Sequence, residues 1–271
     1  MFDFPNAPAI GDRVTGVGGI VYVWDGVKWT SSVGAVTVQS MGDVGRNLIH
    51  NSMFNVAQRG VGPFTGEARS ADRWQQWIAA GDTLSTAINT TDDGIRSQIG
   101  DEAARLVAYL VFTGGSGATN LVLFQQNMEG VRRFAGKTVT VSFWAATSAG
   151  TAKVGVSIDQ FFGTGGSPSA TAPGVGLTIT ATTTWTRYSV TRTIPSAAGK
   201  VIGTNGDDTT QCNIWLSAGS NYATASGGVG VQSGGVAFWG VQLEIGSVVT
   251  PLEKPDPQVE LANCQRFYQV G

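Results

Sequence analysis

Apolar and polar residues alternate along much of this chain, which predicts β-strands joined by short polar turns. In Thr138–Ala145, for example, Val139, Val141 and Phe143 alternate with threonine and serine. The predicted strands are Arg105–Thr113, Asn120–Met128, Thr138–Ala145, Val154–Phe162, Trp185–Ile194, Asn213–Ser217 and Val236–Ile245. Turn residues separate them, a pattern typical of an antiparallel sandwich. We therefore predict an all-β fold.

The last of these strands is apolar on both faces, which favours an interior position. Strict alternation would place Trp239 on one face with Val241 and Leu243, and we expect it in the core. Prolines then end the sheet at Pro251, Pro255 and Pro257. Asp256 is a helix N-cap candidate with Pro257 in the first turn, and Leu261, Cys264 and Tyr268 follow at helical spacing. Residues 253–271 are therefore predicted to be a proline-rich exit and a short docked helix, the one helix expected.

Residues 1–32 form a compact module of their own in this interpretation. Asp25-Gly26 between V-Y-V-W and V-K-W predicts a two-residue hairpin turn. So short a unit buries too little apolar surface to be stable alone, so we expect it to pack on a partner. The predicted attachment residues are Phe2, Phe4, Trp24 and Trp29. Residues 33–46 are a small, glycine-punctuated linker. An apolar alternation over residues 47–60 predicts the opening strand of the sandwich, with His50 inside it.

Composition narrows the function classes. Only 13% of residues are charged, whereas 38 are glycine and eight are tryptophan, so the chain is not a disordered low-complexity segment. The net charge of −2 and the absence of a basic run argue against nucleic-acid binding. Apolar runs are too short for membrane insertion, and the N-terminus does not resemble a signal peptide, so we expect synthesis in a cytosol. We expect Cys212 and Cys264 to be free, buried thiols.

Catalytic and metal chemistry find little support. The single histidine, His50, has no nucleophile motif around it, and no cysteine–histidine spacing suits zinc. A polysaccharide-degrading enzyme would need a carboxylate pair, and loop carboxylates could alternatively hold calcium. We favour solvated turn carboxylates over both, and predict no catalytic residue, cofactor or metal. The carboxylates considered are Asp92, Asp93, Asp101, Glu102, Asp159, Asp207 and Asp208.

Tryptophans are the other candidates for chemistry, because sugar-binding modules stack pyranose rings on exposed indoles. The six considered in the sandwich are Trp74, Trp77, Trp144, Trp185, Trp215 and Trp239. Trp144 and Trp215 lie on the more polar faces of their predicted strands, so they are the candidate ligand-binding residues, with contact to another subunit as the alternative. Two arginine pairs, Arg132-Arg133 and Arg187/Arg192, are interpreted as solvated edge charges.

Several segments together resemble tailed-bacteriophage appendage proteins of the tail-fibre type. The N-terminal match is F-D-F-P-N-A-P with V-Y-V-W-D-G-V-K-W. The others, in order, are N-L-I-H-N-S-M-F-N-V-A-Q-R-G, A-D-R-W, G-K-T-V-T-V-S-F-W-A, T-T-T-W-T-R-Y-S-V-T, F-W-G-V-Q-L-E-I-G and L-A-N-C-Q-R-F-Y-Q. The resemblance implies a carbohydrate-binding-module-like, galactose-binding-like jelly roll at 47–252, assembly into a virion in the host cytoplasm, and trimerisation.

On this resemblance we predict a structural virion protein without catalytic activity. Its N-terminal module would attach it to other virion proteins, and its jelly roll would meet a host-surface glycan. A purely architectural head, collar or baseplate decoration is the alternative, and a polysaccharide depolymerase is a further one. A secreted carbohydrate-binding module would need an export signal, which the N-terminus does not show.

Overall fold

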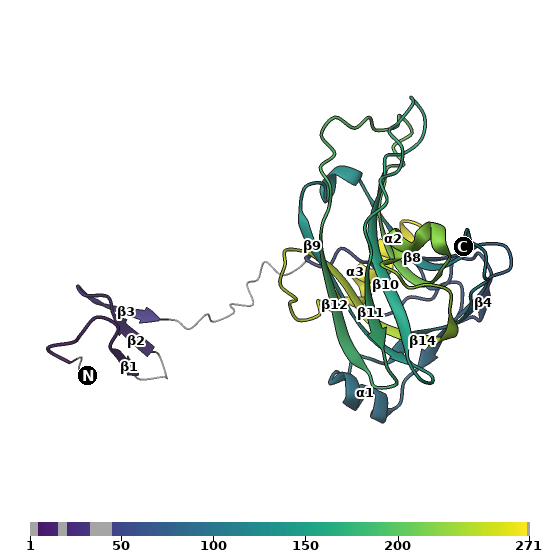
Figure 1. Cartoon of the computed structure of the whole chain (residues 1–271). Coiled ribbons are helices and arrows are strands. Elements are labelled where there is room, and N and C mark those ends of the chain that lie inside the picture. Colours follow the sequence, from purple (N-terminus) through teal and green to yellow (C-terminus); the bar gives the residue numbers. More distant parts are fainter. Residues whose placement is uncertain (1–4, 16–20, 33–44, 270–271) are drawn as a thin grey trace. The chain divides into compact units, whose positions relative to one another are not determined.

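The chain divides into two units, residues 1–44 and 45–271. The computed structural model describes residues 5–15, 21–32 and 45–269 (Figure 1). Phe2, Phe4 and most of the predicted linker lie outside the described residues. The predicted domain boundaries and the roles assigned to each part stay predictions.

The N-terminal unit contains a three-stranded antiparallel sheet in the order β1-β2-β3. Its strands are β1 (Arg13–Thr15), β2 (Val21–Trp24) and β3 (Trp29–Ser32). Trp24 pairs with Trp29, so the hairpin loop spans Asp25–Lys28 and the predicted two-residue turn is wrong. The Asp25 side chain stabilises the longer loop by accepting hydrogen bonds from the backbone N–H groups of Val27 and Lys28, each 2.8 Å long. Both bonds lower the pKa of Asp25, and the bond from Lys28 has the larger effect.

The second unit is an antiparallel sandwich of a five-stranded and a six-stranded sheet (Figure 1). The five-stranded sheet has the order β11 (Leu177–Ala181), β10 (Ala152–Phe161), β13 (Thr209–Ala218), β8 (Leu121–Glu129) and β5 (Trp74–Ile78). The six-stranded sheet has the order β12 (Thr186–Thr193), β9 (Thr138–Thr147), β14 (Ser233–Ile245), β7 (Leu106–Thr113), β6 (Thr83–Thr90) and β4 (Phe64–Thr65). From β7 to β10 and again from β12 to β14, successive strands alternate between the sheets, which is the jelly-roll path. The predicted all-β sandwich is confirmed, with β4, β5, β6 and β11 added to the predicted strands.

Aromatic side chains fill the space between the sheets. Trp74 stacks on Phe124 with ring centroids 4.6 Å apart and planes at 7°, and Phe143 meets Phe238 edge-on at 5.7 Å. All four are fully buried. Rings of this size contribute most of the apolar area that a sandwich removes from water, so they determine which face of each strand points inward.

A β-bulge in β14 changes which residues share a face. The register against β9 shifts between Trp239 and Gln242, and Gly240 has a φ of +61°. Val241 and Leu243 therefore face the main core, whereas Trp239 lies on the outer side of the six-stranded sheet. The prediction that Trp239 shares a face with Val241 and Leu243 is wrong, although Trp239 is fully buried there by other parts of the chain.

Helix α1 (Asp93–Ile99) was not predicted and covers part of that outer side. Asp92 is its N-cap, accepting a hydrogen bond of 2.8 Å from Ile95 N, and Gly100 ends it in the left-handed conformation. Asp92 was expected to be a solvated turn carboxylate, but it has this capping role. The short segments η2 (Val131–Arg133), η3 (Ser220–Tyr222) and α2 (Ala223–Ser226) lie in connections.

The predicted C-terminal helix is confirmed as α3 (Pro257–Gln265), with Asp256 as its N-cap. It buries Glu260 and Cys264, whereas Leu261 is 38% exposed, so the predicted Leu261 docking contact is wrong. Among the helices of the described ranges, none has the length and apolar character of a membrane span.

Residues 47–60 do not form the predicted strand. They make turns in which Asn51 has a φ of +51° and its side chain bonds the backbone of Val56 and Asp72. Because Leu48, Ile49 and Phe54 join the main core, the segment packs on the sandwich as an irregular plug, and His50 lies in a turn.

Candidate functional site

A row of amide side chains crosses the outward face of the five-stranded sheet. The register aligns Gln75 of β5 with Gln125 of β8, then Asn213 of β13, then Ser157 of β10. Their sequence neighbours Trp74, Phe124, Ile214 and Val156 lie in the main core. Since side chains alternate along a strand, this row points away from the core.

Two further rows flank it on the same face. On one side Asn127 aligns with Gln211 and Asp159. On the other, Trp77 aligns with Leu123, Trp215 and Gly155. The face thus gathers amides, one carboxylate and indole rings from four strands that are far apart in the sequence. We call this set the amide face; its polar members are Gln75, Gln125, Asn127, Gln211, Asn213, Ser157 and Asp159.

Hydrogen bonds join these groups into a chain across the sheet. Trp77 Nε1 donates to Gln125 Oε1 at 2.8 Å, and Gln125 Nε2 donates to Asn213 Oδ1 at 2.7 Å. Asn213 Nδ2 in turn donates to Ser157 Oγ at 3.3 Å. Gln125 and Asn213 are therefore each held in one orientation by their neighbours, so that this part of the polar layer is ordered before any ligand arrives.

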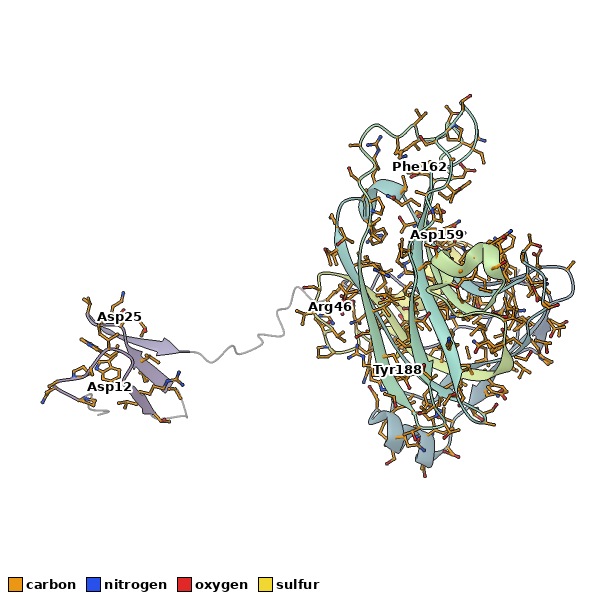
Figure 2. The ribbon with its side chains drawn as sticks, viewed as in Figure 1. Asp12, Asp25, Arg46, Asp159, Phe162 and Tyr188 are labelled. Carbon is orange, nitrogen blue, oxygen red and sulfur yellow. The ribbon has the colours of Figure 1, made fainter. Side chains whose placement is uncertain are left out.

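The chain ends at Asp159 of β10 (Figure 2). Its Oδ1 accepts from Ser157 Oγ at 3.0 Å and from Gly174 N at 2.9 Å. Trp215 Nε1 also donates to Ser157 Oγ, at 3.0 Å. Burial raises the pKa of Asp159, against the hydrogen bonds from Gly174, Ser157 and Asn213, which lower it.

Exposure divides the amide face into a buried layer and an accessible one. Gln125, Asn213 and Ser157 are 5%, 1% and 0% exposed. Trp77 is 38% exposed at the β5 edge, and Gln75, Asn127, Gln211 and Asp159 are half-buried. The Oδ1 atom of Asn127 is buried without a hydrogen-bond partner in the described residues. The accessible layer thus offers donors, acceptors and one ring to a polar ligand.

Helix α2 forms a wall along one side. An added Cβ on Gly155 would lie 2.1 Å from Ser226 O, and one on Gly176 would lie 2.3 Å from Ala225 O. Tyr222, immediately before α2, packs on Trp215 with ring centroids 5.6 Å apart. Close backbone approach therefore needs glycine at these positions and covers Trp215.

The two predicted ligand-binding tryptophans do not lie together. Trp215 is on the amide face but is only 4% exposed, so the expectation of an exposed ring is wrong; the α2 segment covers it. Trp144 is on β9 of the other sheet, half-buried against Trp239 at 5.1 Å and under the Arg187 guanidinium at 4.5 Å. A role for Trp144 in ligand binding stays a prediction. Trp77 was not among the predicted ligand-binding residues. In the segment W-Q-Q-W (residues 74–77), strand alternation places Trp77 on the same face as Gln75 and on the opposite face from Trp74.

The other candidate carboxylates have local structural partners. Asp207 accepts from Thr164 N at 2.8 Å, Asp208 accepts from Val131 N at 2.7 Å, and Asp101 pairs with Lys254 at 2.7 Å. Asp93 and Glu102 both contact Arg96. Within the described ranges no group of three His, Cys, Asp or Glu side chains is placed to hold a metal.

The single histidine and the cysteines are poorly placed for chemistry. Burial, with nearby Arg73, lowers the pKa of His50 to about 4, so the imidazole is neutral at physiological pH. Cys212 and Cys264 are free and buried, as predicted. Burial raises the pKa of each thiol to about 12, which disfavours the nucleophilic thiolate.

Two of the four arginines are not solvated edge charges. Arg187 Nη2 donates to Ser142 Oγ at 3.0 Å and to Thr250 O at 2.8 Å, and Arg192 Nη2 donates to Gly176 O at 2.7 Å. Both are half-buried. Their strand positions beside the C-terminal exit and the β11 edge give them backbone acceptors, which the strand pattern alone did not reveal. Arg132 and Arg133 are exposed, as predicted.

Comparison with solved structures finds similar chains at low sequence identity. A family 4 carbohydrate-binding module aligns over 73% of this chain and 99% of its own, at 18% identity and a TM-score of 0.42. A family 11 carbohydrate-binding module from Clostridium thermocellum, in complex with a β-1,3-1,4-mixed-linked tetrasaccharide, aligns over 69% of this chain and 98% of its own (11% identity, TM-score 0.41). Both are carbohydrate-binding modules to which this chain is similar, whereas its jelly-roll path is given by its own strand order.

A third similar structure is the enzymatically active domain of tailspike protein 4 of bacteriophage CBA120. It aligns over 74% of this chain and 21% of its own, at 14% identity and a TM-score of 0.39. No protein-family model and no curated protein matches the sequence.

Proposed function

We propose that this protein is a non-catalytic glycan-binding protein and that the amide face is its binding surface. The observation that carries the proposal is the hydrogen-bonded chain Trp77–Gln125–Asn213–Ser157–Asp159. Because Gln125, Asn213 and Ser157 are buried, this chain holds them in fixed orientations beside the accessible amides of the same face. It is suited to a ligand that must be met by many oriented hydrogen bonds.

Sugar hydroxyls both donate and accept, and carboxamides can satisfy both functions. The half-buried Gln75, Asn127 and Gln211 supply such groups over the ordered layer beneath. The exposed Trp77 ring at one end supplies a flat apolar surface for the C–H face of a pyranose. A neutral or weakly charged saccharide matches this combination better than an anionic ligand, because Asp159 is the one charge among the three rows.

The number of carboxylates on the amide face supports binding without cleavage. Glycosidases position two carboxyl groups about 5–9.5 Å apart across the scissile bond. In the three rows of the amide face Asp159 is the only carboxylate. The loop carboxylates Asp207 and Asp208 already accept backbone hydrogen bonds from Thr164 and Val131.

The test is glycan binding by the full-length protein and by matched variants. A glycan array followed by calorimetric titration would identify a ligand, and Trp77→Ala should weaken it about tenfold, the equivalent of about 1.4 kcal/mol of stacking. Trp77→Phe keeps a ring for stacking but loses the bond to Gln125, so it should lose less affinity than Trp77→Ala. Val111→Ala removes a 47% exposed side chain from the other sheet and is the control.

Equal affinity of Trp77→Ala and wild type would refute the assignment of the amide face. Release of reducing sugar from a bound polysaccharide would refute the non-catalytic assignment.

We further propose that the protein is a structural virion component of a tailed phage, attached through residues 1–32. This rests on the sequence resemblance and is supported by the separate N-terminal unit, whose small sheet brings Trp24 and Trp29 within 5.6 Å of each other. Deleting residues 1–32 should leave a folded sandwich that no longer incorporates into particles. Incorporation at normal copy number would refute the attachment role.

We also propose that the protein assembles as a homotrimer. The low charged fraction of 13% supports burial of surface between copies. Light scattering of the full-length protein should give a trimer mass. A stable monomer at micromolar concentration would count against it.

Imaging particles that carry a label on the C-terminus would separate receptor binding from the architectural alternative, because the two differ in where the chain lies on the particle.

A further inference from the structure

A pocket whose lining shares no residue with the amide face lies between helix α3 and the turns of residues 53–58. Its volume is about 350 Å³. The walls are mainly apolar and are formed by Met53, Val56, Pro255, Pro257 and Leu261, with Glu260 also in the lining. A cavity of this size and polarity accommodates a side chain or a small molecule.

Glu260 places a carboxylate in this apolar setting. The residue is 6% exposed, and one oxygen, Oε1, accepts a hydrogen bond from Asn51 N. The other oxygen, Oε2, has no hydrogen-bond partner in the described part of the chain. Burial and the nearby Glu253 carboxylate raise the pKa of Glu260, against the bond from Asn51, because no positive charge offsets them.

The cations nearby along the chain already have partners. Arg59 pairs with Asp72 at 3.0 Å, and Lys254 pairs with Asp101 at 2.7 Å. No ion pair joins Glu260 to a cation among the described residues. A buried carboxylate is costly unless it is paired, so the site is electrostatically incomplete as it stands.

We propose that this pocket, the Glu260 pocket, binds a lysine side chain presented by a partner protein. The apolar walls suit the lysine methylenes, which pack on apolar surface while the charged end seeks a partner. The single available oxygen suits a compact ammonium better than an arginine fork, which is matched by both oxygens of a carboxylate. This proposal does not depend on glycan binding.

The test uses the full-length protein and four capped amino acids as probes: Nα-acetyl-lysine N-methylamide and its norleucine, arginine and Nε-acetyl-lysine counterparts. Titrations are followed by ¹H–¹⁵N spectra above neutral pH, because alkaline conditions favour the ionised form of a carboxyl of raised pKa. The lysine probe should bind at least about tenfold more tightly than the norleucine probe, because a charge-assisted hydrogen bond contributes most of the difference. Amide shifts should centre on Ala57, Gln58 and Leu261, which line the pocket.

Glu260→Gln keeps an acceptor oxygen for Asn51 N and removes the charge, so it should abolish the preference for lysine over norleucine. Glu67→Gln alters an exposed carboxylate outside the pocket and should change nothing. If Glu260→Gln fails to fold, the lysine–norleucine comparison on wild type decides the question alone. Equal binding of the two probes, no shifts at the pocket, or tighter binding of the arginine probe would overturn the proposal.

Discussion

Replacing Asn213 with alanine tests whether the amide face is an ordered network. The side chain is 1% exposed and is the central link: its Oδ1 accepts from Gln125 Nε2 at 2.7 Å and its Nδ2 donates to Ser157 Oγ at 3.3 Å. Asn213→Ala leaves Gln125 Nε2 without its acceptor on a residue that is 5% exposed. Ser157 retains its bonds to Trp215 and Asp159, so one orphaned donor dominates the cost.

An unsatisfied buried polar group costs about 1–3 kcal/mol, so we expect a loss of about 2 kcal/mol in the free energy of unfolding. For a unit the size of residues 45–271, that corresponds to a fall in Tm of about 4–8 °C. Calorimetry or urea unfolding measures it. Glycan affinity should fall as well, because the exposed Trp77 loses the support of Gln125.

Gln211→Ala is the matched control. Gln211 lies on the same face and strand but is half-buried and makes no side-chain hydrogen bond in the described structure. Its removal should change stability by less than about 0.5 kcal/mol while still weakening glycan binding. An unchanged Tm in Asn213→Ala, or equal losses in both variants, would refute the ordered network.

Three further predictions concern the same unit. Burial raises the pKa of Asp159, so the stabilising contribution of its protonated form is present below about pH 4 and is lost as pH rises through the raised pKa. Asp159→Asn should therefore be more stable than wild type at about pH 7 and lose that advantage in acid. A difference in Tm that does not depend on pH would contradict this. Gly155→Ala should destabilise the sandwich by about 1–3 kcal/mol, because the new Cβ would lie 2.1 Å from Ser226 O. Gly234→Ala, whose Cβ has its nearest contact at 3.7 Å, should not. Similar unfolding midpoints for the two variants would contradict the α2 packing. With pKa values of about 12, Cys212 and Cys264 should resist thiol labelling at about pH 8 until the protein is unfolded, and rapid native labelling would show that they are accessible.

Features that depend on neighbouring residues in the chain were predictable from the sequence. Alternation within Thr138–Ala145 identified β9, and Asp256 followed by proline identified the start of α3. The same kind of signal surrounds α1, where Asp92 caps the first turn and Gly100 ends the helix, but a pair of adjacent aspartates beside glycine is equally typical of a turn. The free, buried state of the cysteines also followed from their number and surroundings.

Features that depend on register needed the tertiary structure. The bulge at Gly240 moves Trp239 to the opposite face from Val241, and strict alternation cannot anticipate one extra residue in a strand. Likewise, the burial of Trp215 depends on the α2 segment, which packs over it through contacts at Gly155 and Gly176.

The sequence by itself therefore determined the all-β class, the positions of seven sandwich strands (β7 to β10 and β12 to β14) and the C-terminal helix, because hydrophobic period and capping act over a few residues. The tertiary structure alone decided the candidate site. Trp77, Gln125, Ser157 and Asn213 come from β5, β8, β10 and β13, and only the strand order β10-β13-β8-β5 brings them into one hydrogen-bonded chain across two adjacent rows. Strand order is set by how two sheets jointly bury their aromatic core, a property of the whole sandwich that no single segment of the chain encodes.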